Sequence, residues 1–124
     1  MKRAYLSFFM SSFLLVTSVS TASAHTILLS SSPKAGSVVA SMPSTISLTF
    51  NEGLLTIAGK SVNTLSIKDS AGHRLDQGLA TVNEASLSVK SRKSSQTGKF
   101  TVQYRVISAD GHPVTGSFVF TVKQ

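Results

Sequence analysis

The sequence contains no cysteine and no tryptophan, and only five of its 124 residues are acidic. Without cysteine the chain forms no disulfide, so its stability must come from packing. The same absence excludes thiolate metal sites and cysteine nucleophiles. There is also no glycine-rich phosphate loop and no serine in a strand-turn-helix elbow, so neither a nucleotide-binding protein nor a serine hydrolase is expected.

The first 24 residues differ in composition from the rest of the chain. Lys2 and Arg3 form a basic start, an apolar run follows, and residues 22–24 read Ala-Ser-Ala. This order is typical of a cleaved secretory signal peptide. The apolar run is too short for a retained membrane anchor, since a spanning helix needs about 20 predominantly apolar residues. We therefore predict a signal peptide over residues 1–24 and one mature domain over residues 25–124, with His25 as the new N-terminus.

Basic residues outnumber acidic ones in the mature chain. Removal of Lys2 and Arg3 from the 12 basic residues leaves 10, against 5 acidic ones. Four of the 10 lie close together in the sequence: Lys90, Arg92, Lys93 and Lys99. No aromatic residues interleave these charges, so we interpret the cluster as a solvated loop rather than a polyanion or membrane patch, and expect no nucleic-acid partner.

Short alternating segments separated by turn residues run through the mature chain. Residues 44–50 are the clearest example, with Ile46, Leu48 and Phe50 on one face. Such period-two alternation predicts half-buried strands. Strands are predicted at residues 26–31, 38–40, 44–50, 62–68, 78–83, 85–90, 99–107 and 115–123. About seven short strands with frequent turns, and almost no helix, predict an all-β sandwich or barrel.

The last two predicted strands form a hairpin whose loop carries chemistry. Residues 108–112 read Ser-Ala-Asp-Gly-His, and residues two apart in extended chain point the same way. Asp110 and His112 can therefore aim at one point. An alternative stays open, because Asp-Gly is a common hairpin turn for backbone reasons alone.

Signal-peptide cleavage creates a further candidate ligand. An N-terminal His25 offers its α-amine and ring Nδ1 to the same metal ion, although a histidine at this position can also be chance. With the imidazole of His112 and a carboxylate oxygen of Asp110, the set has three nitrogens and one oxygen, which suits tetragonal Cu(II). We expect the first and last strands to lie side by side and so to bring these residues together.

Several sequence motifs, in order along the chain, resemble the CopC family of periplasmic copper-resistance proteins. They are His25 directly after Ala-Ser-Ala, LSSSP at 29–33 with Gly36, LTFNE at 48–52, GKFTVQYRVISADGH at 98–112, and GSFVF at 116–120. The resemblance implies a cupredoxin-like, immunoglobulin-like Greek-key β-sandwich. It also implies one Cu(II) site with His25, Asp110 and His112 as ligands. Glu52 matches an acidic position near that site in the family, and we expect an auxiliary role for it, beside the ligands rather than among them.

Two features depart from the family pattern, and a third, His73, falls outside it. Some members carry a methionine-rich loop that binds Cu(I), but this chain has only Met42 after cleavage, so a second, Cu(I) site is not expected. Tyr104 stands where a tryptophan is frequent, which we interpret as a core substitution of similar size. His73 lies in a predicted turn, and we expect it to be exposed.

The resemblance implies a periplasmic copper-binding protein that sequesters or delivers copper and catalyses no reaction. Implied partners are an inner-membrane copper transporter of the CopD type or a periplasmic multicopper oxidase. Two alternatives stay open. One is a copper monooxygenase that cleaves polysaccharides with a similar amine-and-histidine site, although such enzymes present a flat aromatic surface and this chain has no tryptophan. The other is a β-sandwich interaction module without metal.

Overall fold

The computed structural model describes residues 25–124, so the predicted signal peptide at 1–24 lies outside the described residues. That part of the chain forms eight strands. They are β1 (Leu28–Ser32), β2 (Val38–Val39), β3 (Thr45–Phe50), β4 (Thr64–Lys68), β5 (Asp76–Asn83), β6 (Ser86–Ser91), β7 (Gly98–Ile107) and β8 (Pro113–Val122). Each predicted strand corresponds to an observed one, with ends that differ by at most two residues.

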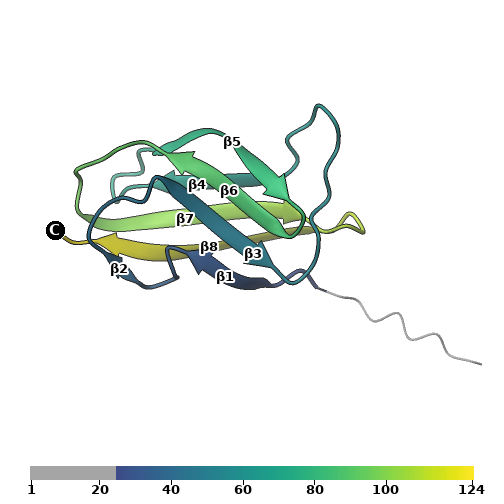
Figure 1. The fold of residues 1–124 in the computed structure, drawn as a ribbon, viewed down its shortest axis with the longest axis horizontal. Helices are drawn as coiled ribbons and strands as arrows, with labels where there is room; N and C mark the ends of the chain where they lie inside the picture. The colour runs from purple at the N-terminus through teal and green to yellow at the C-terminus, as the bar shows by residue number, and fades with distance from the viewer. Residues whose placement is uncertain (1–24) are drawn as a thin grey trace, which may run out of the picture.

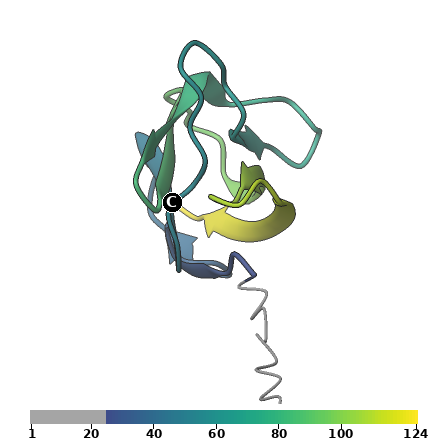
Figure 2. The same cartoon turned by 90° about the vertical axis from the view of Figure 1, so that its right-hand side faces the viewer.

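Two four-stranded sheets pack face to face (Figures 1 and 2). The first has the order β1-β3-β6-β5 and the second β2-β8-β7-β4. All pairs are antiparallel except β2 with β8, which is parallel. The predicted all-β sandwich is therefore confirmed.

The core lies between the sheets and follows the alternation in the sequence. In β3, Ile46, Leu48 and Phe50 are buried, while the residues between them are not. From the second sheet, Phe100 and Phe120 meet as a cross-strand pair with ring centroids 5.6 Å apart. Burial of side chains of this size stabilises the fold by roughly 1.5–3 kcal/mol each.

The expectation that the first and last strands lie side by side is wrong for strand pairing. β1 pairs with β3, whereas β8 lies between β7 and β2 in the other sheet. The reason is the turn around Pro33: it carries the chain from the first sheet to the second, where Val38 and Val39 occupy the free edge of β8. The two predicted ligand segments are therefore held in different sheets.

The loops between successive strands from β3 to β8 alternate between the two ends of the sandwich. The loop after β3, the β5–β6 turn and the β7–β8 loop share one end, as a hydrogen bond from Leu54 N to Glu84 O and a bridge between Leu54 and Ser108 show. Figure 1 shows the described chain beginning at this same end. Within residues 25–124, no helix is long and apolar enough to cross a membrane.

Candidate metal centre

The β7–β8 loop is a tight turn closed by its own backbone. Ser108 N donates to His112 O at 2.9 Å, and Gly111 N donates to Ser108 O at 2.9 Å. Gly111 has a φ of 92°, a conformation that glycine adopts without steric cost. Ser108 is only 2% exposed, and its hydroxyl accepts a hydrogen bond from His112 N at 3.0 Å. A buried serine therefore anchors a loop whose tip projects into solvent.

Asp110 and His112 contact each other at this tip, as their spacing predicted. His112 Nδ1 lies 2.9 Å from Asp110 Oδ2, and the two side chains are 78% and 60% exposed. The Ser108 hydroxyl donates to the other carboxylate oxygen, Oδ1. Hydrogen bonds from Ser108 and then from His112 lower the pKa of Asp110 to about 2. The loop thus presents an ionised carboxylate beside an accessible imidazole.

His25 is exposed at the same end of the sandwich, at the start of the described chain (Figure 1). The next residue, Thr26, is only 6% exposed, and its hydroxyl donates to Glu52 Oε1. Glu52 therefore lies against the residue that follows His25. No pattern in the sequence indicated that Glu52 would have Thr26 as its hydrogen-bond partner.

The structure brings together two of the three predicted ligands. Among residues 25–124, no three histidine, aspartate or glutamate side chains lie close enough together to hold a metal ion. Asp110 and His112 form a pair, and His25 stands apart from that pair at the same end of the molecule. A site made of all three requires His25 to turn toward the loop.

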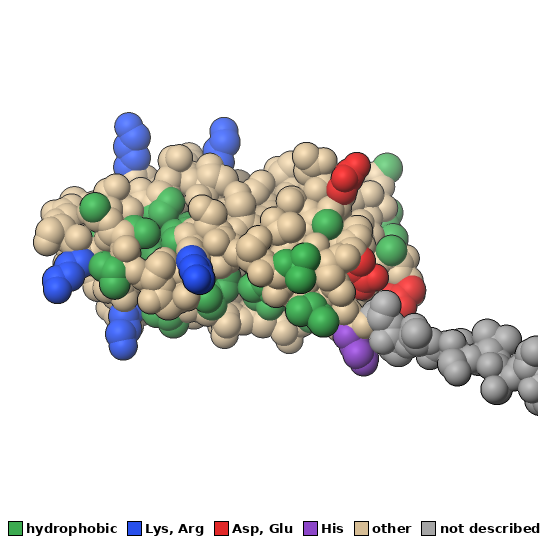
Figure 3. Space-filling model, turned by 60° about the horizontal axis from the view of Figure 1, so that its bottom comes forward, with side chains coloured by type: hydrophobic (Ala, Val, Ile, Leu, Met, Phe, Trp, Pro, Cys, Tyr) green, Lys and Arg blue, Asp and Glu red, His purple; other side chains and the backbone are tan. Residues whose placement is uncertain are grey.

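Three of the five acidic residues of the described chain lie at one end of the sandwich. Glu52, Glu84 and Asp110 lie on the loops of the end that carries His25, and Figure 3 shows acidic side chains gathered where the described chain begins. On the face that Figure 3 shows, the lysine and arginine side chains lie away from this end. A concentration of carboxylates raises the local concentration of cations. The carboxylates at this end of the molecule are therefore favourable to a metal cation.

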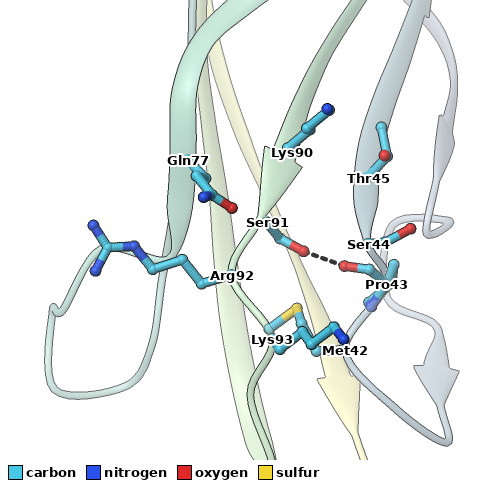
Figure 4. A pocket seen from close by; sticks show the side chains of 9 residues that line it. All are labelled: Met42, Pro43, Ser44, Thr45, Gln77, Lys90, Ser91, Arg92 and Lys93. Carbon is cyan, nitrogen blue, oxygen red and sulfur yellow. Dashed lines mark hydrogen bonds between the residues drawn. The ribbon is translucent and has the colours of Figure 1, made fainter.

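A hollow of about 500 Å³ lies at the opposite end (Figure 4). Lys90, Arg92 and Lys93 line it together with Met42. Arg92 and Lys90 point in different directions, and the lining includes no acidic residue. Three positive charges and one thioether do not favour a metal cation, so we do not place the candidate metal site in this hollow.

The third histidine lies away from the candidate site. His73 occupies the turn between β4 and β5, where its side chain is 79% exposed and its Nδ1 lies 3.2 Å from Asp69 Oδ2. The prediction of an exposed turn histidine is confirmed. Hydrogen bonds from the backbone and side chain of His73 lower the pKa of Asp69, against a smaller opposing effect of burial.

Two residues that organise the candidate site were missed by sequence reasoning. Ser108 anchors the loop, and Asn51 binds the backbone on either side of Thr26. Both lie within the motifs that carry the family resemblance, at 48–52 and 98–112, but neither residue was assigned a role from its own chemistry.

Comparisons with known proteins agree on one family. The CopC domain model matches residues 28–123. Copper resistance protein C of Escherichia coli is 35% identical over 107 residues, which cover 82% of this chain and 84% of that protein. A Bacillus subtilis protein named copper transport protein CutJ is 28% identical over 105 residues, which cover 82% of this chain but 19% of that longer protein.

The solved structures lead to the same result. The crystal structure of CopC from Methylosinus trichosporium OB3b superposes with a TM-score of 0.69 at 30% identity, covering 80% of this chain and 94% of that one. Its likeness extends over nearly all of the described sandwich. On the match of the domain model, the sequence identity and the shared fold, the chain belongs to the CopC domain family.

Proposed function

We propose that the mature chain, residues 25–124, binds one Cu(II) ion in the periplasm and sequesters or carries it in copper resistance and homeostasis. The observation that carries this proposal is the exposed Asp110–His112 pair at the end of the sandwich where His25 lies. Membership of the CopC family and the name of the Escherichia coli relative support copper as the cargo.

The proposed ligands are the α-amine and imidazole of His25, the imidazole of His112 and the carboxylate of Asp110. Three nitrogens and one oxygen suit the tetragonal geometry of Cu(II). Both histidine side chains are exposed, so packing does not oppose a rotation of His25 toward the loop. Asp110 needs no deprotonation at neutral pH, because its pKa is about 2.

Glu52 has an auxiliary role in this proposal. It accepts a hydrogen bond from Thr26, so it holds the residue next to His25 rather than the ion itself. Its charge adds to those of Glu84 and Asp110 at this end of the molecule. Steering of a cation by such a charged end affects the association rate more than the final affinity.

One Cu(II) site without a Cu(I) site is favoured by the available donors. A Cu(I) site needs several soft ligands, and Met42 is the one methionine that remains after residue 24. Met42 lines the hollow at the opposite end beside Lys90 and Lys93, whose charges repel a cation. Transfer between two oxidation states within this protein is therefore not part of the proposal.

The proposed location and partners follow from the sequence and the family. The signal peptide predicted over residues 1–24 sends the chain to the periplasm and frees the amine of His25. A copper transporter of the CopD type is supported as a partner by the Bacillus subtilis relative, a longer copper transport protein of which the match covers 19%. A multicopper oxidase is the other proposed acceptor. We propose no catalytic activity for this protein.

Electron paramagnetic resonance of the mature protein with one equivalent of Cu(II) tests the proposal. We expect a tetragonal signal with hyperfine coupling to nitrogen, reduced in the His112→Ala variant. His73→Ala is the matched control, since it removes an equally exposed histidine from the opposite end and should leave the signal unchanged. Absence of stoichiometric binding in equilibrium dialysis would overturn the proposal in favour of an interaction module, and oxygen-dependent polysaccharide cleavage by the copper-loaded protein would favour the monooxygenase.

A further inference from the structure

Asn51 binds the N-terminal segment with both ends of its carboxamide. Its Nδ2 donates to His25 O at 3.2 Å, and its Oδ1 accepts from Ile27 N at 2.8 Å. Its backbone N–H also donates to Ile27 O at 3.0 Å. These three bonds extend the pairing of β1 with β3 beyond its last registered pair, Leu28 with Phe50. The backbone of residues 25–27 is thereby held in one position.

The side chains of this segment alternate between the inside and the outside of the molecule. Thr26 is 6% exposed and is bound to Glu52, whereas Ile27 is 57% exposed. His25, two residues before Ile27, is exposed like it. The bonds of Asn51 and Glu52 thus turn Thr26 inward and present His25 to solvent.

The chain that follows Asn51 reaches the base of the β7–β8 loop. Leu54 forms an isolated bridge with Ser108, and Leu55 N donates to Ile107 O at 2.9 Å. Asn63, which is 4% exposed, strengthens this contact: its Nδ2 donates to Leu55 O and its Oδ1 accepts from Ile107 N, both at 2.8 Å. One asparagine therefore fastens each end of residues 51–55.

We infer that residues 51–55, here called the connector, set the position of His25 relative to Asp110 and His112, and that Asn51 is the positioning residue of the copper site. β1 and β8 do not pair, so the connector is a direct hydrogen-bonded route from His25 to the loop. A fixed arm loses less conformational freedom when it closes on an ion than a free one does. This inference rests on the proposed function.

The decisive variant is Asn51→Ala in the mature protein recovered after export of the full chain. It removes both side-chain bonds at an exposed position, so the core is untouched. We expect the dissociation constant for Cu(II), measured by competition with a chelator, to rise about 10–100-fold, the range found for residues that orient metal ligands. The paramagnetic resonance signal should become heterogeneous, because the arm no longer has one position.

Asn83→Ala is the matched control. Asn83 is an exposed asparagine at the same end of the sandwich, and its side chain forms no hydrogen bond within residues 25–124. It should leave Cu(II) affinity, the spectrum and the melting temperature as in the wild type. A similar melting temperature for Asn51→Ala separates a positioning role from general destabilisation.

Amide hydrogen exchange without copper tests the contact by itself. The N–H of Ile27 loses its acceptor in Asn51→Ala, so its exchange should become faster there and stay slow in Asn83→Ala. Unchanged exchange, or Cu(II) affinity within twofold of the wild type with the same spectrum, would overturn the inference while the proposed function stands. Failure of the wild type itself to bind Cu(II) would instead reject the proposed function, and faster exchange in Asn51→Ala would still show the contact.

Discussion

His112 Nδ1 lies 2.9 Å from Asp110 Oδ2, so two of the proposed copper ligands contact each other before any ion is considered. A carboxylate bonded to one ring nitrogen fixes the tautomer and directs the other nitrogen outward. While Asp110 holds Nδ1, Nε2 points away from the carboxylate, so binding of one ion by both proposed ligands requires this contact to open. The buried Ser108 hydroxyl secures the arrangement through the second oxygen of the same carboxylate.

The first prediction concerns the acidity of Asp110. Its pKa is lowered from 3.8 to about 2, chiefly by the hydrogen bond from Ser108. Ser108→Ala removes that donor, so the carboxyl titration followed by nuclear magnetic resonance should move from about 2 toward 3.8. Because the pKa is lowered in the folded state, the stabilisation by this contact is present above pH 3.8 and is lost as the pH falls through about 2. Ser117→Ala, at an exposed position of β8, is the control for this titration. A titration midpoint that stays at about 2 in Ser108→Ala would assign the lowered pKa of Asp110 to another group.

The second prediction tests the N-terminal ligand. An alanine added before His25 moves the α-amine to another residue and breaks the chelate ring formed with the ring nitrogen of His25. Cu(II) affinity should fall by more than about 100-fold, the upper end of the range for residues that only orient ligands. Chelator competition measures the change. An alanine added after Gln124, at the opposite end of the sandwich, serves as the control, and unchanged affinity in the N-terminal extension would remove the amine from the ligand set (Figure 1).

The third prediction is the pH dependence of copper binding. Protons compete with the metal for the α-amine, which ordinarily titrates near 8, and for both imidazoles. Asp110 stays ionised until the pH approaches about 2, so it takes up no proton in this range. Affinity should therefore fall steadily as the pH is lowered from about 8 to 5. The slope should be smaller in His112→Ala, and equal slopes would show that this imidazole is not a ligand.

The sandwich itself was predictable because its signal is local. Alternation at Ile46, Leu48 and Phe50 gives one buried face whatever the strand pairs with. The β7–β8 hairpin was predictable too, since both strands alternate and five residues join them. β1 has no such alternation, and only its pairing with β3 reveals which side chains it buries.

The candidate site was predictable as a set of residues but not as an arrangement. The spacing of Asp110 and His112 is local and led to the observed contact. The bonds of Asn51 join residues 24 and 26 positions apart, and no pattern within a strand encodes them. The pairing of β2 with β8 displaced β1 from the position that sequence reasoning gave it. Long-range partners of this kind depend on how the two sheets assemble.

The fourth prediction concerns the cross-strand pair of Tyr104 and Gly116. Tyr104 packs against the core and contacts Phe50 edge to face, with ring centroids 5.5 Å apart, which agrees with its interpretation as a core residue. A Cβ at position 116 would lie 2.9 Å from Tyr104 Cε1 and closer still to Tyr104 Cζ and the hydroxyl oxygen. Gly116→Ala should therefore displace the ring and lower the free energy of unfolding by about 1–3 kcal/mol.

Chemical denaturation with Gly53→Ala as the control measures this effect. No atom lies within 4 Å of a Cβ built at Gly53, so that substitution should change stability little. Without the ring, in a Tyr104→Ala background, nothing clashes with a Cβ at position 116. Adding Gly116→Ala to that variant should therefore lower the free energy of unfolding very little. If the two losses of free energy of unfolding simply add in the double variant, contact with the Tyr104 ring is not the reason for the cost of Gly116→Ala.

The last prediction separates stability from copper binding at the end opposite to the candidate site. Arg74 binds both carboxylate oxygens of Asp76, at 3.1 Å from Nε and 2.6 Å from a terminal nitrogen, and Ile67 N adds a third bond at 3.1 Å. Burial raises the pKa of Asp76, but the bonds from Arg74 and Ile67 outweigh it, so the pKa lies below 3.8. Arg74→Ala should lower the free energy of unfolding by about 1 kcal/mol, the upper value for a pair with an exposed partner.

The loss of stability in Arg74→Ala should be present at neutral pH and should decrease at acidic pH. A pKa lowered in the folded state contributes stability above pH 3.8, and that contribution is lost as the pH falls through the folded value. Thermal melts at pH 7 should therefore separate Arg74→Ala from the wild type by about 4–8 °C, and this separation should shrink as the pH is lowered below 3.8. Arg105→Ala removes an exposed arginine that forms no ion pair within residues 25–124, so it is the control for loss of charge alone. Cu(II) affinity should be unchanged in both variants, and a changed affinity in Arg74→Ala would mean that the two ends of the sandwich are coupled.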